Sequence, residues 1–136
     1  MTDLSALPLP AVTPITEPFW TGGANDQLLI QRCTACEHWI HPPAPICPSC
    51  LSTDVGPQPV SGRGTIASFT INWQPWLPNL EVPYALAIVE LPEQAGLRLT
   101  SRIVDCAMSD IAIGQTVSVT FAPHGDVWLP LFRPVP

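Results

Sequence analysis

The 136-residue sequence predicts a mainly β protein, in which a short helix and a four-cysteine metal ribbon precede a five-stranded barrel. Two Cys-x-x-Cys pairs lie close together between residues 33 and 50. Beyond residue 60, short runs of alternating side chains are separated by turn residues, as in small β domains. Eighteen prolines disfavour long helices and favour loops and extended segments. Together these observations favour short strands over helices along most of the chain.

The first element is an arm, residues 1–15, which contains three prolines and shows no apolar periodicity. We expect it to be disordered or to lie extended along a partner surface. A helix start follows, with Thr16 as the N-terminal cap and Pro18 tolerated in the first turn. Phe19 and Trp20 are its expected buried anchors. Two glycines come directly afterwards, so the helix should be short.

The metal ribbon is the strongest prediction of the sequence. In a Cys-x-x-Cys turn both sulfurs come from the ends of a tight loop and occupy neighbouring corners of a tetrahedron, so two such turns complete a four-thiolate shell. We expect residues 16–59 to form the helix and ribbon, with strands at 28–33 and 38–41 and a linker at 51–59. The predicted ligands are Cys33, Cys36, Cys47 and Cys50.

Zinc suits this donor set, and iron in a rubredoxin-like site uses the same donors and geometry. A four-thiolate shell has no open position, so the metal is expected to be structural. Two disulfides, a thioredoxin-like redox pair and cysteines that no longer hold metal are the alternatives. Glu37 and Leu51 stand where a glycine often follows the second cysteine, and Cys106 is an expected buried free thiol.

Residues 60–136 are expected to form the barrel. Gly62 and Gly64 flank the start of the first strand, where a barrel needs a sharp bend or bulge. A helical turn at 108–114 precedes the fourth strand. Five strands in this arrangement predict a closed Greek-key barrel, an OB-fold. The expected strands are 65–73, 84–91, 97–104, 116–121 and 127–132.

The charge balance argues against nucleic-acid binding. The chain has no lysine and five arginines against eleven carboxylates, which gives a formal net charge of -6. Nucleic-acid binding depends on the neutralisation of phosphates by cations, and an acidic chain is poorly equipped for it. No apolar run approaches about eighteen residues, and the first residues do not resemble a signal peptide. We therefore expect a cytoplasmic, reduced protein with no membrane span.

The residues also argue against an independent active site. Nucleophilic catalysis needs a serine or cysteine beside a base, and no Gly-x-Ser-x-Gly motif is present. His38 and His41 are expected at the surface near the ribbon, although either could replace a ligand. His124 lies in a turn and is expected to have no role. The chain alone is therefore predicted not to be an enzyme.

The sequence resembles the acyl-CoA-associated OB-fold family, also known as domain of unknown function 35, whose members join a rubredoxin-like zinc ribbon to an OB-fold. The resemblance covers the chain from about residue 16 to its end. It is carried by Phe19-Trp20, Leu28, Gln31-Arg32-Cys33, Cys36, Pro42-Pro43, Cys47-Pro48-Ser49-Cys50, Ser61-Gly62-Arg63-Gly64-Thr65, Pro83-Tyr84, Val89-Glu90-Leu91, Ile113-Gly114, Val117 and Phe132-Arg133-Pro134.

This resemblance implies an accessory subunit of a thiolase-superfamily enzyme. Such proteins are similar to partners of acyl-CoA thiolases, acyltransferases and lipid-transfer-protein-like aldolases that shorten steroid side chains. They stabilise the catalytic chain and support its acyl-CoA site. A heterotetramer with two copies of each chain is expected. A free-standing acyl-CoA-binding module is the alternative, and a single-stranded nucleic-acid-binding OB-fold is disfavoured by the lack of lysine.

A stiff loop between the first two barrel strands is the predicted partner-binding surface. Aromatic residues and prolines supply contact area at a low cost in ordering entropy. In the alternative, Trp73 and Leu80 close one end of the barrel. Arg63 and Arg102 are candidates for pairing with a CoA phosphate or a partner carboxylate, or for ordinary surface ion pairs. The predicted contact residues of the loop are Trp73, Trp76, Leu77 and Leu80.

Overall fold

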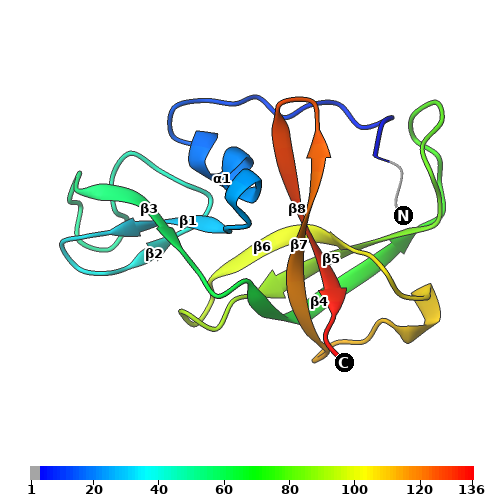
Figure 1. The fold of residues 1–136 in the computed structure, drawn as a ribbon. Coiled ribbons are helices and arrows are strands. Elements are labelled where there is room, and N and C mark those ends of the chain that lie inside the picture. The colour runs from blue at the N-terminus through cyan, green and yellow to red at the C-terminus, as the bar shows by residue number, and fades with distance from the viewer. Residues whose placement is uncertain (1–3) are drawn as a thin grey trace.

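A computed structural model describes residues 4–136, and residues 1–3 of the predicted arm lie outside the described residues. The chain folds into a small three-stranded sheet beside a closed five-stranded barrel, with the short helix α1 (Glu17–Thr21) at their junction (Figure 1). The prediction of a mainly β protein with one short helix, a ribbon and an OB-fold barrel is confirmed. No helix within residues 4–136 is both long and apolar enough to cross a membrane.

Helix α1 ends where glycine was expected to stop it. The chain passes at once into the 3₁₀ helix η1 (Gly22–Asn25), and Cβ atoms at both of its glycines would collide with neighbouring atoms. Thr16 is the N-cap residue, as predicted, but its side chain does not bond to the helix, because its hydroxyl accepts a hydrogen bond from the Thr13 amide at 2.9 Å instead. Phe19 and Trp20 are half-buried, so they anchor the helix only partly.

The ribbon sheet has the order β2-β1-β3 and is antiparallel throughout. Strand β3 corrects the prediction of a linker at 51–59, because all five of its residues pair with β1. A linker was expected from the two prolines in this segment, which an edge strand tolerates. The strands are β1 (Leu29–Cys33), β2 (Trp39–Ile40) and β3 (Val55–Pro59). The predicted domain boundary after residue 59 stays a prediction.

The barrel closes in the order β4-β5-β6-β8-β7, with β7 returning to β4. Strands β6 and β8 run parallel and pair only between Ile103 and Phe132, and the 3₁₀ helix η2 (Met108–Asp110) precedes β7. All five predicted barrel strands are present within a few residues of their expected bounds. They are β4 (Arg63–Asn72), β5 (Tyr84–Glu90), β6 (Arg98–Ile103), β7 (Thr116–His124) and β8 (Val127–Pro134).

Strand β4 contains a register shift between Ile66 and Ser68. The bulge was expected nearer Gly62 and Gly64, at the start of the strand. Its position changes which residues face inward, because a bulge shifts the alternation by one. Ile66 is fully buried, and Phe69 packs against the same core although strict alternation places the two on opposite faces.

The N-terminal arm packs against the barrel through Leu4 and Leu7, so this part of the arm is ordered on its own fold, while contact of the arm with a partner stays a prediction. Leu4 is 6% exposed and joins Val104 and Leu131 in a small apolar cluster. His124 Nε2 lies 2.7 Å from the Leu7 carbonyl oxygen, so this nitrogen carries the proton and donates. Figure 1 shows the arm crossing over the β7–β8 hairpin towards α1. His124, for which no role was predicted, therefore holds the arm.

Candidate functional site

The four ribbon cysteines converge at one end of the small sheet. Their Sγ atoms all lie within 4.8 Å of one another, and the Cys33–Cys50 and Cys36–Cys47 pairs are each 3.6 Å apart. A tetrahedral Zn²⁺ site with Zn–S bonds of about 2.3 Å requires sulfurs about 3.8 Å apart. The cluster therefore fits one structural Zn²⁺ without further ligands.

Each cysteine pair is shaped by a tight turn. The amide of Glu37 donates to the carbonyl of Cys33, and the amide of Leu51 donates to the carbonyl of Cys47, both at 2.9 Å. Glu37 and Leu51 have φ values of 66° and 65°, in the left-handed region that glycine adopts most easily. The turn geometry is thus retained at the two positions where the sequence lacks the usual glycine.

The turns also prepare the thiols to bind a cation. The Cys36 amide donates to the Cys33 sulfur and is the main reason why the pKa of Cys33 falls to about 7. Burial alone would raise the pKa of Cys47, but the amides of Cys50 and Ser49 lower it below its ordinary value. The Ser52 amide favours the Cys50 thiolate, but the neighbouring cysteines raise its pKa to about 12. A divalent cation removes this repulsion between thiolates.

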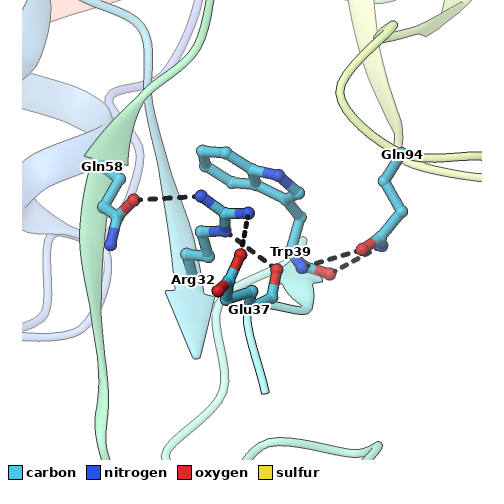
Figure 2. A network of polar contacts seen from close by, with 5 residues as sticks. All are labelled: Arg32, Glu37, Trp39, Gln58 and Gln94. Atoms are coloured by element: carbon cyan, nitrogen blue, oxygen red, sulfur yellow. Dashed lines mark hydrogen bonds and ion pairs between the residues drawn. The ribbon is translucent and has the colours of Figure 1, made fainter. Parts of the chain in front are cut away.

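A polar network joins the ribbon to the barrel (Figure 2). The side-chain amide of Gln94, in the β5–β6 turn, accepts from the Trp39 amide at 2.9 Å and donates to the Trp39 carbonyl at 3.0 Å. The Arg32 guanidinium lies 4.5 Å from the centre of the Trp39 ring and donates to the Glu37 carbonyl at 2.8 Å. Gln94 thus pairs with both backbone groups of Trp39, as a neighbouring strand would do beside β2. No pattern in the sequence predicted this role.

Replacing Gln94 with alanine should loosen the ribbon from the barrel, because two backbone groups of Trp39 lose their partners. The expected cost is about 1–3 kcal/mol of unfolding free energy. Amide hydrogen exchange at Trp39 and chemical denaturation measure it. Gln58→Ala is the control, since the Gln58 amide reaches Arg32 only at 3.5 Å. An equal effect of both changes would contradict the bridging role.

The loop between β4 and β5 lies at the side of the barrel far from the ribbon (Figure 1). Trp73 is 67% exposed, Trp76 is 70% exposed and Leu77 is 39% exposed. Trp76 is held in place by its indole N–H, which donates to Asn72 Oδ1 at 2.9 Å. Leu80 is 8% exposed and is buried in the fold. Of the four predicted contact residues, the structure brings three to the surface and turns Leu80 inward.

The two candidate arginines differ in their burial. Arg102 on β6 is buried, with its guanidinium carbon 3.9 Å from the centre of the Tyr84 ring. Burial lowers the pKa of Arg102, while Tyr84 and Glu81 act in the opposite direction. Arg63, at the start of β4, is exposed. Arg102 therefore packs against Tyr84, the first residue of β5 after the loop, whereas Arg63 is accessible to solvent.

The histidines and the fifth cysteine lie outside the metal cluster. His41 is half-buried against Phe19, with ring centres 5.0 Å apart, and burial lowers the pKa of this histidine. It lines a pocket of about 560 Å³ between α1, the ribbon and the outer face of β5 and β6. Cys106 was expected to be buried but is half-buried, and burial raises the pKa of its thiol. Neither residue belongs to the four-cysteine cluster.

Comparison with known families assigns both parts of the chain. Residues 20–56 match the rubredoxin-like zinc ribbon domain of ChsH2, and residues 57–122 match the C-terminal OB-fold domain of ChsH2. The zinc ribbon and the OB-fold barrel described above are therefore those of a known family.

Two curated relatives are much longer than this chain. The chain is 38% identical over 129 residues to a "Probable enoyl-CoA hydratase alpha subunit" of Thermomonospora curvata, covering 93% of this chain and 40% of the relative. It is 33% identical over 132 residues to the "3-oxo-4,17-pregnadiene-20-carboxyl-CoA hydratase alpha subunit" of Mycobacterium tuberculosis, covering 97% of this chain and 42% of the relative. The chain thus spans about two-fifths of the length of these relatives.

A solved structure, the "Ltp2-ChsH2(DUF35) aldolase", matches nearly the whole fold. One of its chains is 37% identical to this chain. The superposition has a TM-score of 0.82 and covers 93% of this chain and 98% of that one. The four-cysteine ribbon, the closed barrel and these matches agree, and the chain belongs to the ChsH2 (DUF35) family of zinc-ribbon OB-fold proteins.

Proposed function

We propose that this protein is a non-catalytic accessory subunit of a thiolase-superfamily enzyme that cleaves or transfers acyl-CoA substrates. The observation that carries the proposal is the loop between β4 and β5. It exposes Trp73, Trp76 and Leu77 on a chain that matches almost the full length of one chain of the Ltp2-ChsH2 aldolase. Exposed aromatic groups of this kind are typical anchors of protein interfaces.

The site chemistry supports an accessory role. The His124 ring bonds to the backbone carbonyl of Leu7 at 2.7 Å, and the ribbon cysteines contact one another, so these groups are engaged in structural contacts. A four-thiolate zinc shell offers no position for substrate or water. The protein contributes surface and rigidity, and the partner contributes the reacting groups. Retro-aldol cleavage of a steroid-derived acyl-CoA is the favoured reaction, because the matched structure is named an aldolase and one relative is named for a pregnadiene carboxyl-CoA.

Assembly with the partner is proposed as a heterotetramer with two copies of each chain. A reducing, cytoplasmic setting is proposed with it, because such a setting keeps four cysteines available as metal thiolates. In this arrangement the aromatic loop docks on the catalytic chain, and an acyl-CoA site lies close to the shared surface.

Co-expression with a thiolase-superfamily aldolase chain tests the proposal. We expect the two chains to elute together on gel filtration at the mass of two copies of each. Acyl-CoA cleavage should require the catalytic chain and should be absent from the purified zinc protein alone. Turnover by the lone protein, or separate elution of the two chains at micromolar concentration, would overturn the proposal.

A further inference from the structure

Two arginine-bearing segments that are far apart in the sequence meet on the outer face of the barrel. Arg63 in β4 pairs with Ser118 in β7, and Ser118 pairs in turn with Arg133 in β8. Residues directly opposite each other in a sheet share a face, and neighbouring strands lie about 4.8 Å apart. Arg63 and Arg133 therefore flank Ser118 on one face, with backbones about 10 Å apart. Both arginines are exposed.

The glycines around Arg63 fix its position in this row. Gly62 has φ +80°, and a Cβ there would lie 2.7 Å from Val119 Cγ1. A Cβ at Gly64 would collide with Val89 Cγ1. The Arg63 amide also donates to the Ser61 hydroxyl at 3.2 Å. Close backbone packing on both sides thus holds the start of β4 against β5 and β7 and leaves Arg63 pointing outward.

Neither of the two cations has an ion-pair partner among residues 4–136. The ion pairs of residues 4–136 join Arg32 to Glu37 and Arg98 to Glu90, and none involves Arg63 or Arg133. The acid nearest in the sheet pairing is Glu90, opposite Thr65, and it is held by Arg98 at 2.8 Å. In a chain of net charge -6, these two arginines place two positive charges on one sheet face, and the carboxylate of Glu93 lies at the edge of this row, where it accepts from the Ser61 amide at 2.9 Å.

The surrounding side chains suit a phosphate. Ser118 lies between the arginines, and Thr65 and Thr116 form the next row of the same face, so that hydroxyl donors accompany the two guanidinium groups. A single arginine fork satisfies the two oxygens of a carboxylate. Two forks with a hydroxyl between them match the additional oxygens of a phosphate or diphosphate, which planar guanidinium groups bind in bidentate fashion.

We propose that Arg63, Ser118 and Arg133 bind the phosphate or diphosphate group of a small ligand. This inference rests on the proposed function, in which an acyl-CoA site lies near the subunit surface, because a nucleotide-bearing thioester supplies such phosphates. Free inorganic phosphates share the chemistry and are the other source. Arg63 was singled out in the sequence together with Arg102, but the sheet register pairs it with Arg133 instead.

Isothermal titration of the full-length zinc protein with pyrophosphate, CoA and pantetheine tests the site. We expect pyrophosphate and CoA to bind, with affinity falling as salt rises, and pantetheine, which has no nucleotide, not to bind. Arg63→Gln and Arg133→Gln should each weaken binding about tenfold or more. Lysine at both positions should restore only part of the lost affinity, because lysine keeps the charge but lacks the planar guanidinium group. Arg98→Gln removes the same charge from a paired arginine and should change affinity by less than about threefold.

The outcomes separate the ligand source and the two proposals. Much tighter binding of CoA than of pyrophosphate identifies the nucleotide-bearing thioester, and equal binding identifies inorganic phosphate. Binding of pantetheine as tight as that of CoA, or no pyrophosphate binding by the wild type, overturns the site. The double glutamine variant should still elute with the catalytic chain. If it loses only the partner, the row is a protein contact, so the inference fails while the proposed function stands. If the wild type binds phosphate but does not assemble with the catalytic chain, the phosphate site stands and the proposed function fails.

Discussion

Replacing Cys47 with serine should release the metal and unfold the ribbon. Cys47 is fully buried, and its sulfur lies 3.6 Å from that of Cys36. Structural zinc in small domains contributes roughly 10–16 kcal/mol of apparent binding free energy, which rivals the whole stability of a typical domain. The ribbon sheet has only three short strands and buries little apolar surface of its own. It is therefore expected to depend on the metal for folding.

Metal analysis should find about one zinc per chain in the wild type and almost none in the variant. Hydrogen exchange should show lost protection in β1, β2 and β3, with the barrel strands protected as before. Cys106→Ser is the matched control, because this thiol is half-buried and lies outside the metal cluster. Full zinc content in the Cys47 variant, or a metal-free wild type with an intact ribbon, would contradict a structural zinc site.

Replacing Trp76 with alanine should weaken assembly with the catalytic chain by about 2 kcal/mol, or roughly thirtyfold. Trp76 is 70% exposed, and its indole N–H is held by Asn72, so the ring is presented in a defined position. Truncating a central aromatic anchor removes buried area and leaves a void in the interface. Pull-down of the catalytic chain by immobilised variants, followed by titration, measures this loss.

Leu77→Asp should weaken binding by a similar amount, because it places a charge in an apolar contact. Ile113→Ala is the control, since Ile113 is 69% exposed but precedes β7 rather than lying in the loop. Salt should change the wild-type affinity only weakly if the contact is mainly apolar. Zinc content is measured in every variant. Equal recovery of the partner by the wild type and both loop variants would show that the partner binds elsewhere.

Local patterns in the sequence were sufficient for the metal cluster of the ribbon and for the order of the barrel strands along the chain, although they missed strand β3. Cysteine spacing predicts a metal cluster because both ligands of each pair lie in one tight turn, so no distant contact is needed to place them. The barrel strands were predicted for a similar reason, since each is a short segment bounded by its own turn residues. The arrest of α1 at Gly22 follows from intrinsic helix propensity, which is likewise local.

Tertiary structure alone decided which distant residues meet. Gln94 bonds to Trp39 across 55 residues, His124 holds Leu7 across 117, and Arg63 shares a row with Arg133. No periodic pattern in the sequence predicts these contacts. Each depends on how the barrel closes and on the register of its strands. The bulge in β4 is a further case. It lets both Ile66 and Phe69 pack in the core, although regular alternation along the strand would place them on opposite faces. Spacing along the chain therefore determined the metal site, while closure of the barrel determined how the ribbon, the arm and the arginine row are placed around it.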